Sequence, residues 1–189
     1  MYGSTNDVDV PNFGNYGHDG SEVERERCAT VQRNNSESFW NTDEFANSLM
    51  SNPDILIISL GACDAVDGNW NEDSEVMFKQ DYKALLQTYQ GLYTKPEIYV
   101  MTPPPSVNNA DPPKNSTITN EVLQRLIPEI VAEVGLPAEN IIDMYTILGT
   151  SDDLEPQFNC NPQCCPYWIP NAAGHNYLAS KLYKAFMDP

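Results

Sequence analysis

The chain has 189 residues and is 41% hydrophobic, which is enough for one domain over residues 1–189 with a sizeable core. Ten Lys and Arg against 27 Asp and Glu give a formal net charge of −17, so its surface repels phosphate backbones and argues against a nucleic-acid partner. The longest apolar run, residues 55–63, is far shorter than the roughly 20 residues that a transmembrane helix needs. Residues 1–11 are polar and acidic and lack the apolar core of a signal peptide.

The first predicted elements are a helix and a strand. The helix is expected to run from Asn41 to about Met50, because Asn41 and Glu44 have the spacing of a capping box. The run Ile55-Leu56-Ile57-Ile58-Ser59-Leu60 is short, apolar and rich in β-branched residues, and it ends at Gly61. Such a run is typical of a strand that is buried on both faces of a sheet.

Helices and strands alternate through the rest of the chain. Apolar residues recur at steps of three and four in residues 78–89 and 122–134, which predicts two amphipathic helices. Strands are predicted at residues 97–101 and 140–144, and a final helix carries Leu178, Leu182, Tyr183 and Phe186. This alternation predicts an α/β fold, a three-layer α/β/α sandwich with a central parallel sheet. In such sheets the functional groups gather in the loops beyond the carboxyl ends of the strands.

Three blocks in the loops resemble, in order, those of the SGNH (GDSL-type) esterases. Asn12-Phe13-Gly14-Asn15-Tyr16-Gly17 resembles their second block, and Gly61-Ala62-Cys63-Asp64 resembles their Gly-x-Asn-Asp third block. Pro170-Asn171-Ala172-Ala173-Gly174-His175 resembles the residues that follow their Asp-x-x-His. The resemblance covers about residues 10–186 and implies the flavodoxin-like sandwich of that family.

The resemblance also implies that the catalytic residues are missing. The family uses a Ser nucleophile from a first block, which would precede this chain, and Ser4 stands too close to the second block to replace it. Gly17 keeps a backbone donor for the oxyanion hole, whereas Cys63 exchanges the family's Asn amide for a weak thiol donor. The family's Asp and His fall at Pro166 and Ile169, and neither residue can accept a proton.

The surviving polar and aromatic residues are expected to be structural. His175 is expected at the first turn of the last helix, and His18 in a solvated loop. Asp64 is expected to keep a structural hydrogen bond at a strand end, with Asp143 on the same rim. Two aromatic residues at the place of the base loop are expected to fill the cleft or to present a binding surface; they are Tyr167 and Trp168.

The family's first strand lies between its second and third strands, so its loss would leave buried strand edges unpaired. Three alternatives remain open at this stage. Residues 2–10 could serve as the strand, another chain could supply it, or the sequence could belong to a longer product.

Three of the five cysteines crowd one loop, at Cys160, Cys164 and Cys165. A short disulfide from Cys160 to Cys164 or Cys165 is the favoured interpretation, with a zinc site that includes His175 and free thiols as alternatives. Glycosylation acceptor motifs at Asn34 and Asn115 add a weak preference for an organelle lumen or the cell exterior.

The leading hypothesis is a catalytically inactive SGNH-like protein that acts as a structural or interaction subunit with other protein subunits. One alternative is a weak or unconventional esterase with Ser4 or Cys63 as nucleophile. Another is a glycan-binding domain in which aromatic residues stack on sugar rings, namely Trp70, Tyr167 and Trp168. None of the three hypotheses requires a cofactor.

Overall fold

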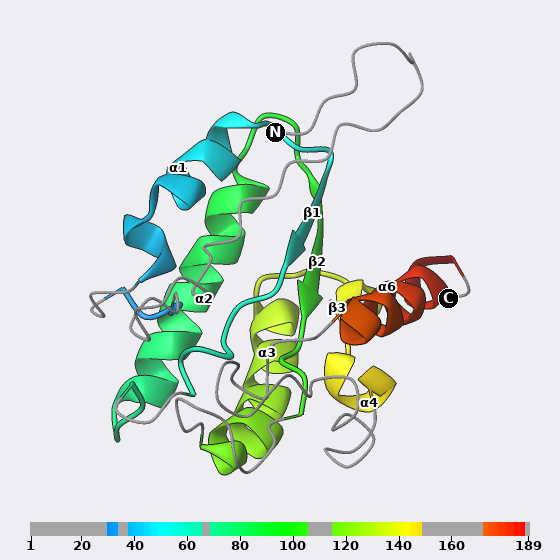
Figure 1. The fold of residues 1–189 in the computed structure, drawn as a ribbon. Coiled ribbons are helices and arrows are strands. Elements are labelled where there is room, and N and C mark those ends of the chain that lie inside the picture. The colour runs from blue at the N-terminus through cyan, green and yellow to red at the C-terminus, as the bar shows by residue number, and fades with distance from the viewer. Residues whose placement is uncertain (1–29, 34–37, 66–68, 106–114, 149–171, 188–189) are drawn as a thin grey trace.

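The computed structural model describes residues 30–33, 38–65, 69–105, 115–148 and 172–187. Its sheet has three parallel strands in the order β1-β2-β3, which are β1 (Ile55–Ile58), β2 (Glu97–Met101) and β3 (Ile141–Ile142). Ile55 pairs with Glu97, and Val100 pairs with Ile141. The predicted α/β fold with a parallel sheet is therefore confirmed (Figure 1).

Helices connect the strands. They are α1 (Asp43–Met50), α2 (Ser74–Gln90), α3 (Leu123–Glu133), α4 (Met144–Leu148) and α6 (Ala172–Met187). Short 3₁₀ turns lie at η1 (Phe39–Asn41) and η3 (Ala138–Asn140), and a π-helical turn, η2 (Ile118–Val122), leads into α3. Figure 1 shows α1 and α2 on one side of the strands and α4 and α6 on the other. No helix in the described ranges has both the length and the apolar character needed to cross a bilayer.

Strand β2 has helices against both of its faces. Ile98 and Val100 are buried in the large core cluster that includes the apolar faces of α2 and α3. Tyr99 and Met101 point the other way, as alternation along a strand requires. They belong to a second cluster, built around Ile142 and Met144, to which α6 contributes Tyr177, Leu178 and Leu182. Helix α6 thus covers β2 and β3.

The prediction that the first strand is buried on both faces is wrong. Ile58 is buried, but Ile55 and Ile57 are 59% and 48% exposed. The physical reason is the placement of α6, whose packing contacts on the sheet are with residues of β2 and β3. In the described part of the chain β1 is paired with β2 alone and forms one edge of the sheet.

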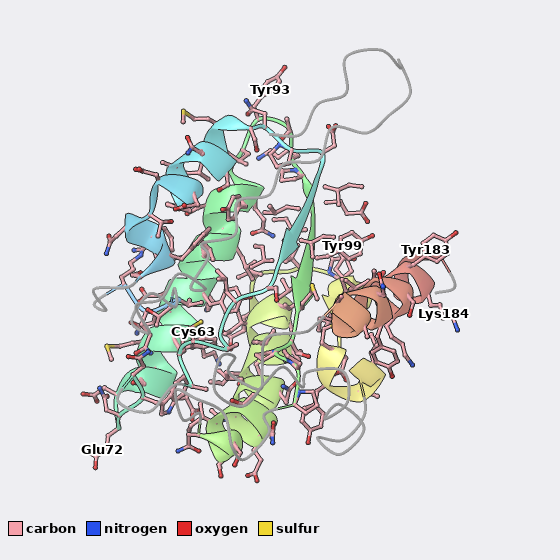
Figure 2. The ribbon with its side chains drawn as sticks, viewed as in Figure 1. Cys63, Glu72, Tyr93, Tyr99, Tyr183 and Lys184 are labelled. Carbon is pink, nitrogen blue, oxygen red and sulfur yellow. The ribbon has the colours of Figure 1, made fainter. Side chains whose placement is uncertain are left out.

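Several predicted boundaries also need correction. The cap of α1 is Thr42 rather than Asn41, because the Thr42 hydroxyl accepts from the Phe45 amide at 3.1 Å. Strand β3 is shorter than the predicted residues 140–144, since the chain enters α4 at Met144. The predicted final helix is α6, on which Tyr183 is 65% exposed (Figure 2).

Candidate functional site at the carboxyl end of the sheet

The loop after β1 turns sharply at Gly61. Gly61 has a φ of +112°, and a Cβ placed there would lie 3.3 Å from Cζ of Phe78. Glycine is therefore required here both by its backbone conformation and by the close approach of the α2 side chain. The Asp64 amide then donates to the Gly61 carbonyl at 3.1 Å, which closes the turn that carries Cys63 and Asp64.

The Asp64 carboxylate is fully buried and holds a second segment of the chain, residues 30–32. Its two oxygens accept from the Val31 amide at 3.1 and 3.0 Å. Oδ1 also accepts from the amide of Gln32 at 3.4 Å and from its side-chain Nε2 at 3.3 Å. The expected structural role of Asp64 is thus what the geometry shows.

Burial dominates the electrostatics of Asp64. It raises the pKa of this carboxyl from 3.8 to about 7, and the hydrogen bonds from Val31 and Gln32 lower it only in part. Tyr82 of α2 is also fully buried, and its pKa is raised by burial and then by the charge of Asp64. Both groups face the interior, and neither is exposed to a solvent-borne substrate.

Cys63 is not a thiol. The residue is disulfide-bonded, so the expectations of a weak thiol donor and of a Cys63 nucleophile are wrong. Its carbonyl accepts from the Asn69 side chain at 2.9 Å, and the Asn69 carbonyl accepts from Gln32 Nε2 at 3.2 Å. Figure 2 shows Cys63 beyond the carboxyl end of β1. Through Asn69, the loop that carries Cys63 is therefore connected to Gln32 by hydrogen bonds.

Asp143 lies beyond the end of β3, and its carboxylate is also occupied. Its Oδ1 accepts from the Thr146 amide at 3.0 Å and its Oδ2 accepts from the Thr146 hydroxyl at 2.6 Å. The Thr102 hydroxyl, at the end of β2, donates to Oδ1 at 3.4 Å. Asp143 therefore stabilises the first turn of α4 and ties it to β2.

Many of the predicted site residues lie outside the described residues. They are Ser4, Gly17, His18, Cys160, Cys164, Cys165, Pro166, Tyr167, Trp168 and Ile169. His175 is in the first turn of α6, as expected, although its side chain is not among those described. Trp70 is half-buried and packs against the core, with its ring centroid 5.7 Å from that of Phe78.

The titratable side chains that the structure describes at the carboxyl end of the sheet are carboxylates. The described side chains include no histidine, because the two histidines of the chain are His18 and His175. They also contain no cluster of three or more His, Cys, Asp or Glu residues that could hold a metal ion. The two carboxylates at the sheet edge, Asp64 and Asp143, are engaged by backbone amides.

The role of residues 30–32 was not predicted. The sequence Thr30-Val31-Gln32 has no capping, turn or catalytic pattern that would have identified it. The contact joins residues that are 33 positions apart, and the donors are mostly backbone amides, which every residue carries. An acidic residue in the turn after β1 was the one signal that could have been used, and it identifies only the acceptor.

Comparison with known proteins gives a likeness of fold. No family model matches the chain, and no curated protein matches its sequence. Among solved structures, the chain is similar to the crystal structure of the acetyl xylan esterase AlAXEase, with a TM-score of 0.51 and 18% sequence identity. The likeness covers 75% of this chain and 71% of that one. The protein thus has an α/β fold of the kind found in an esterase.

Proposed function

We propose that this chain is a catalytically inactive SGNH-like protein that serves as a structural or interaction subunit. The proposal includes the complete three-layer α/β/α sandwich and the loss of the Ser, Asp and His of the triad. The fold likeness to an acetyl xylan esterase supports the scaffold. The substitutions at Pro166 and Ile169 support the loss of the catalytic residues.

The observation that carries the proposal is the bonding of Cys63. An oxyanion hole needs donors that point at the developing charge, and a disulfide sulfur donates no hydrogen bond. The neighbouring Asp64 is buried and directed to residues 30–32 instead of to a substrate. Removal of a single triad member already lowers activity by several orders of magnitude, so the combined losses leave little ordinary turnover.

An interaction role is supported by the surface of β1. Ile55 and Ile57 expose 59% and 48% of their surface on the face of the sheet that α6 leaves open. These two side chains are available to contact another protein on that open face. The disulfide of Cys63 supports a protein that matures in an oxidising lumen or outside the cell.

The test is hydrolysis of 4-nitrophenyl acetate by the purified full chain, with Ser4→Ala as the matched variant. The proposal predicts the same rate for both proteins, equal to the rate in buffer that contains an unrelated acidic protein. Turnover that is lost in Ser4→Ala would establish the alternative of an unconventional esterase and overturn the proposal.

The fold likeness to an acetyl xylan esterase gives specific support to the glycan-binding alternative. Titration calorimetry with xylo-oligosaccharides separates it from the leading proposal. Binding without hydrolysis that weakens in Trp168→Ala would favour a sugar-binding domain. Absence of a heat signal at millimolar sugar would exclude the sugar-binding alternative and favour the structural or interaction role.

A further inference from the structure

We infer that the disulfide partner of Cys63 is Cys28. The inference does not depend on the proposed function, since an active enzyme could carry the same crosslink. Four cysteines are available as partners, and all four lie outside the described residues; they are Cys28, Cys160, Cys164 and Cys165. The choice among them follows from the described segments that lie next to Cys63.

Residues 30–32 are fixed against the loop that carries Cys63. Val31 donates to both oxygens of Asp64, the residue after Cys63, at 3.1 and 3.0 Å. Gln32 contacts Asp64 and the Asn69 carbonyl, and Asn69 in turn donates to the Cys63 carbonyl at 2.9 Å. The segment therefore bonds to Asp64, the residue after Cys63, and to Asn69, whose side chain donates to the Cys63 carbonyl.

Cys28 is only three residues before Val31. Successive Cα atoms are about 3.8 Å apart, so the Cys28 Cα lies within about 11 Å of the Val31 Cα. A disulfide needs a Cα separation of about 4.4–6.8 Å, which is well inside that reach. The segment is further held by the Phe39 amide, which donates to the Thr30 carbonyl at 2.8 Å.

The other three cysteines have no comparable anchor. They lie between Leu148, the last residue of α4, and Ala172, the first residue of α6. Cys160 is 12 residues from each end, and both helices belong to the cluster on the opposite face of the sheet from α2. A bond from this segment to Cys63 would close a far longer loop, which is entropically less favourable.

Formation of the bond is an ordinary thiol oxidation. Each thiol loses one proton, and the two electrons pass to the disulfide of an exchange partner such as glutathione disulfide, which leaves as two thiols. The product joins residues 28–32 to residues 61–65 by a covalent bond beside the Asp64 hydrogen bonds. The carboxyl end of β1 is then crosslinked where the resembling family has an amide donor.

The test is peptide mapping of the full chain, produced in a bacterial periplasm, alkylated under denaturing conditions and digested with trypsin without reduction. Cleavage after Arg27, Arg33 and Lys79 gives peptides 28–33 and 34–79, whereas Cys160, Cys164 and Cys165 share peptide 126–181. The inference predicts that peptide 28–33 is linked to peptide 34–79. A link between peptides 34–79 and 126–181 would overturn it, as would an alkylated Cys63.

A pair of variants gives an independent readout. Cys28→Ser is expected to make Cys63 fully reactive to iodoacetamide in denaturant, whereas Cys160→Ser leaves Cys63 unlabelled. Labelling of Cys63 in Cys160→Ser alone would contradict the inference. If Cys28→Ser does not accumulate as folded protein, the wild-type peptide map still decides the question.

Discussion

The amide of Val31 donates to both oxygens of the Asp64 carboxylate, at 3.1 and 3.0 Å, in a site that is fully buried. This contact joins the segment before α1 to the loop after β1. Asp64 thus stabilises the carboxyl end of the sheet. Its hydrogen-bonding capacity is used within the protein.

Replacement of Asp64 by Ala is expected to destabilise the protein strongly. It would leave the amides of Val31 and Gln32 buried without an acceptor and would open a small cavity, at a combined cost of about 3–5 kcal/mol. Urea unfolding followed by tryptophan fluorescence measures the change. The matched control is Glu133→Gln, whose solvent-exposed pairs with Lys79 and Lys83 are expected to contribute little to stability. Equal losses of unfolding free energy in the two variants would contradict a stabilising role for the Asp64 hydrogen bonds.

The stability of the protein is expected to decrease as the pH rises from 4 to 7. The folded-state pKa of Asp64 is raised to about 7 against 3.8 for an exposed group, so the folded state binds more protons in this interval than the unfolded state does. The free energy of unfolding therefore decreases as the pH rises through the interval, by up to about 4 kcal/mol from this group.

The net charge of −17 acts in the same direction, so a variant is needed to isolate Asp64. Asp64→Asn should flatten the pH dependence between pH 4 and pH 7, as measured by chemical unfolding at each pH. An unchanged slope in Asp64→Asn would assign the dependence to the general charge instead.

Substitution of Gly61 by Ala is expected to be more harmful than substitution of Gly135. Both glycines have positive φ, at +112° and +75°, but an added Cβ meets the Phe78 ring at 3.3 Å in the first case and nothing within 4 Å in the second. We expect losses of about 2–4 kcal/mol for Gly61→Ala and about 1 kcal/mol for Gly135→Ala. Thermal unfolding of the two variants gives the comparison, and similar midpoints would contradict the close packing of Phe78.

The two faces of β1 are expected to differ in their tolerance of polar residues. Ile57 is 48% exposed and Ile58 is 6% exposed. Ile57→Thr should change the free energy of unfolding by less than about 1 kcal/mol, whereas Ile58→Thr should reduce it by about 2–4 kcal/mol. A large loss at Ile57 in urea unfolding would mean that this face is covered in solution, which would itself locate an interface.

The strands and helices of this fold were predictable where local patterns decide them. Residues 97–101 were predicted as a strand and form β2 with those limits. Boundaries set by side-chain capping were less accurate. The Thr42 hydroxyl, rather than Asn41, caps α1. The Asp143 carboxylate accepts from the Thr146 amide at the start of α4, so the helix begins where the strand was predicted to continue.

Long-range relationships could not be predicted from local pattern. The exposure of Ile55 and Ile57 depends on which strands α6 covers, and nothing in the sequence of β1 reports the position of a helix more than 110 residues later. The disulfide of Cys63 was also not predicted, because the spacing of the cysteines at 160–165 favoured a disulfide within that loop. Asp64 was assigned correctly as structural, but its partner Val31 offered no distinguishing side chain.

The most direct test of the proposed loss of catalysis is deacetylation of acetylated xylan by the purified full chain, measured as acetate released over many hours. An acetyl xylan esterase at the same concentration serves as the positive control. We predict no acetate above the rate of an unrelated acidic protein, with the Cys63 disulfide intact or reduced. Sustained release of many acetates per protein molecule would contradict the assignment of this chain as an inactive protein.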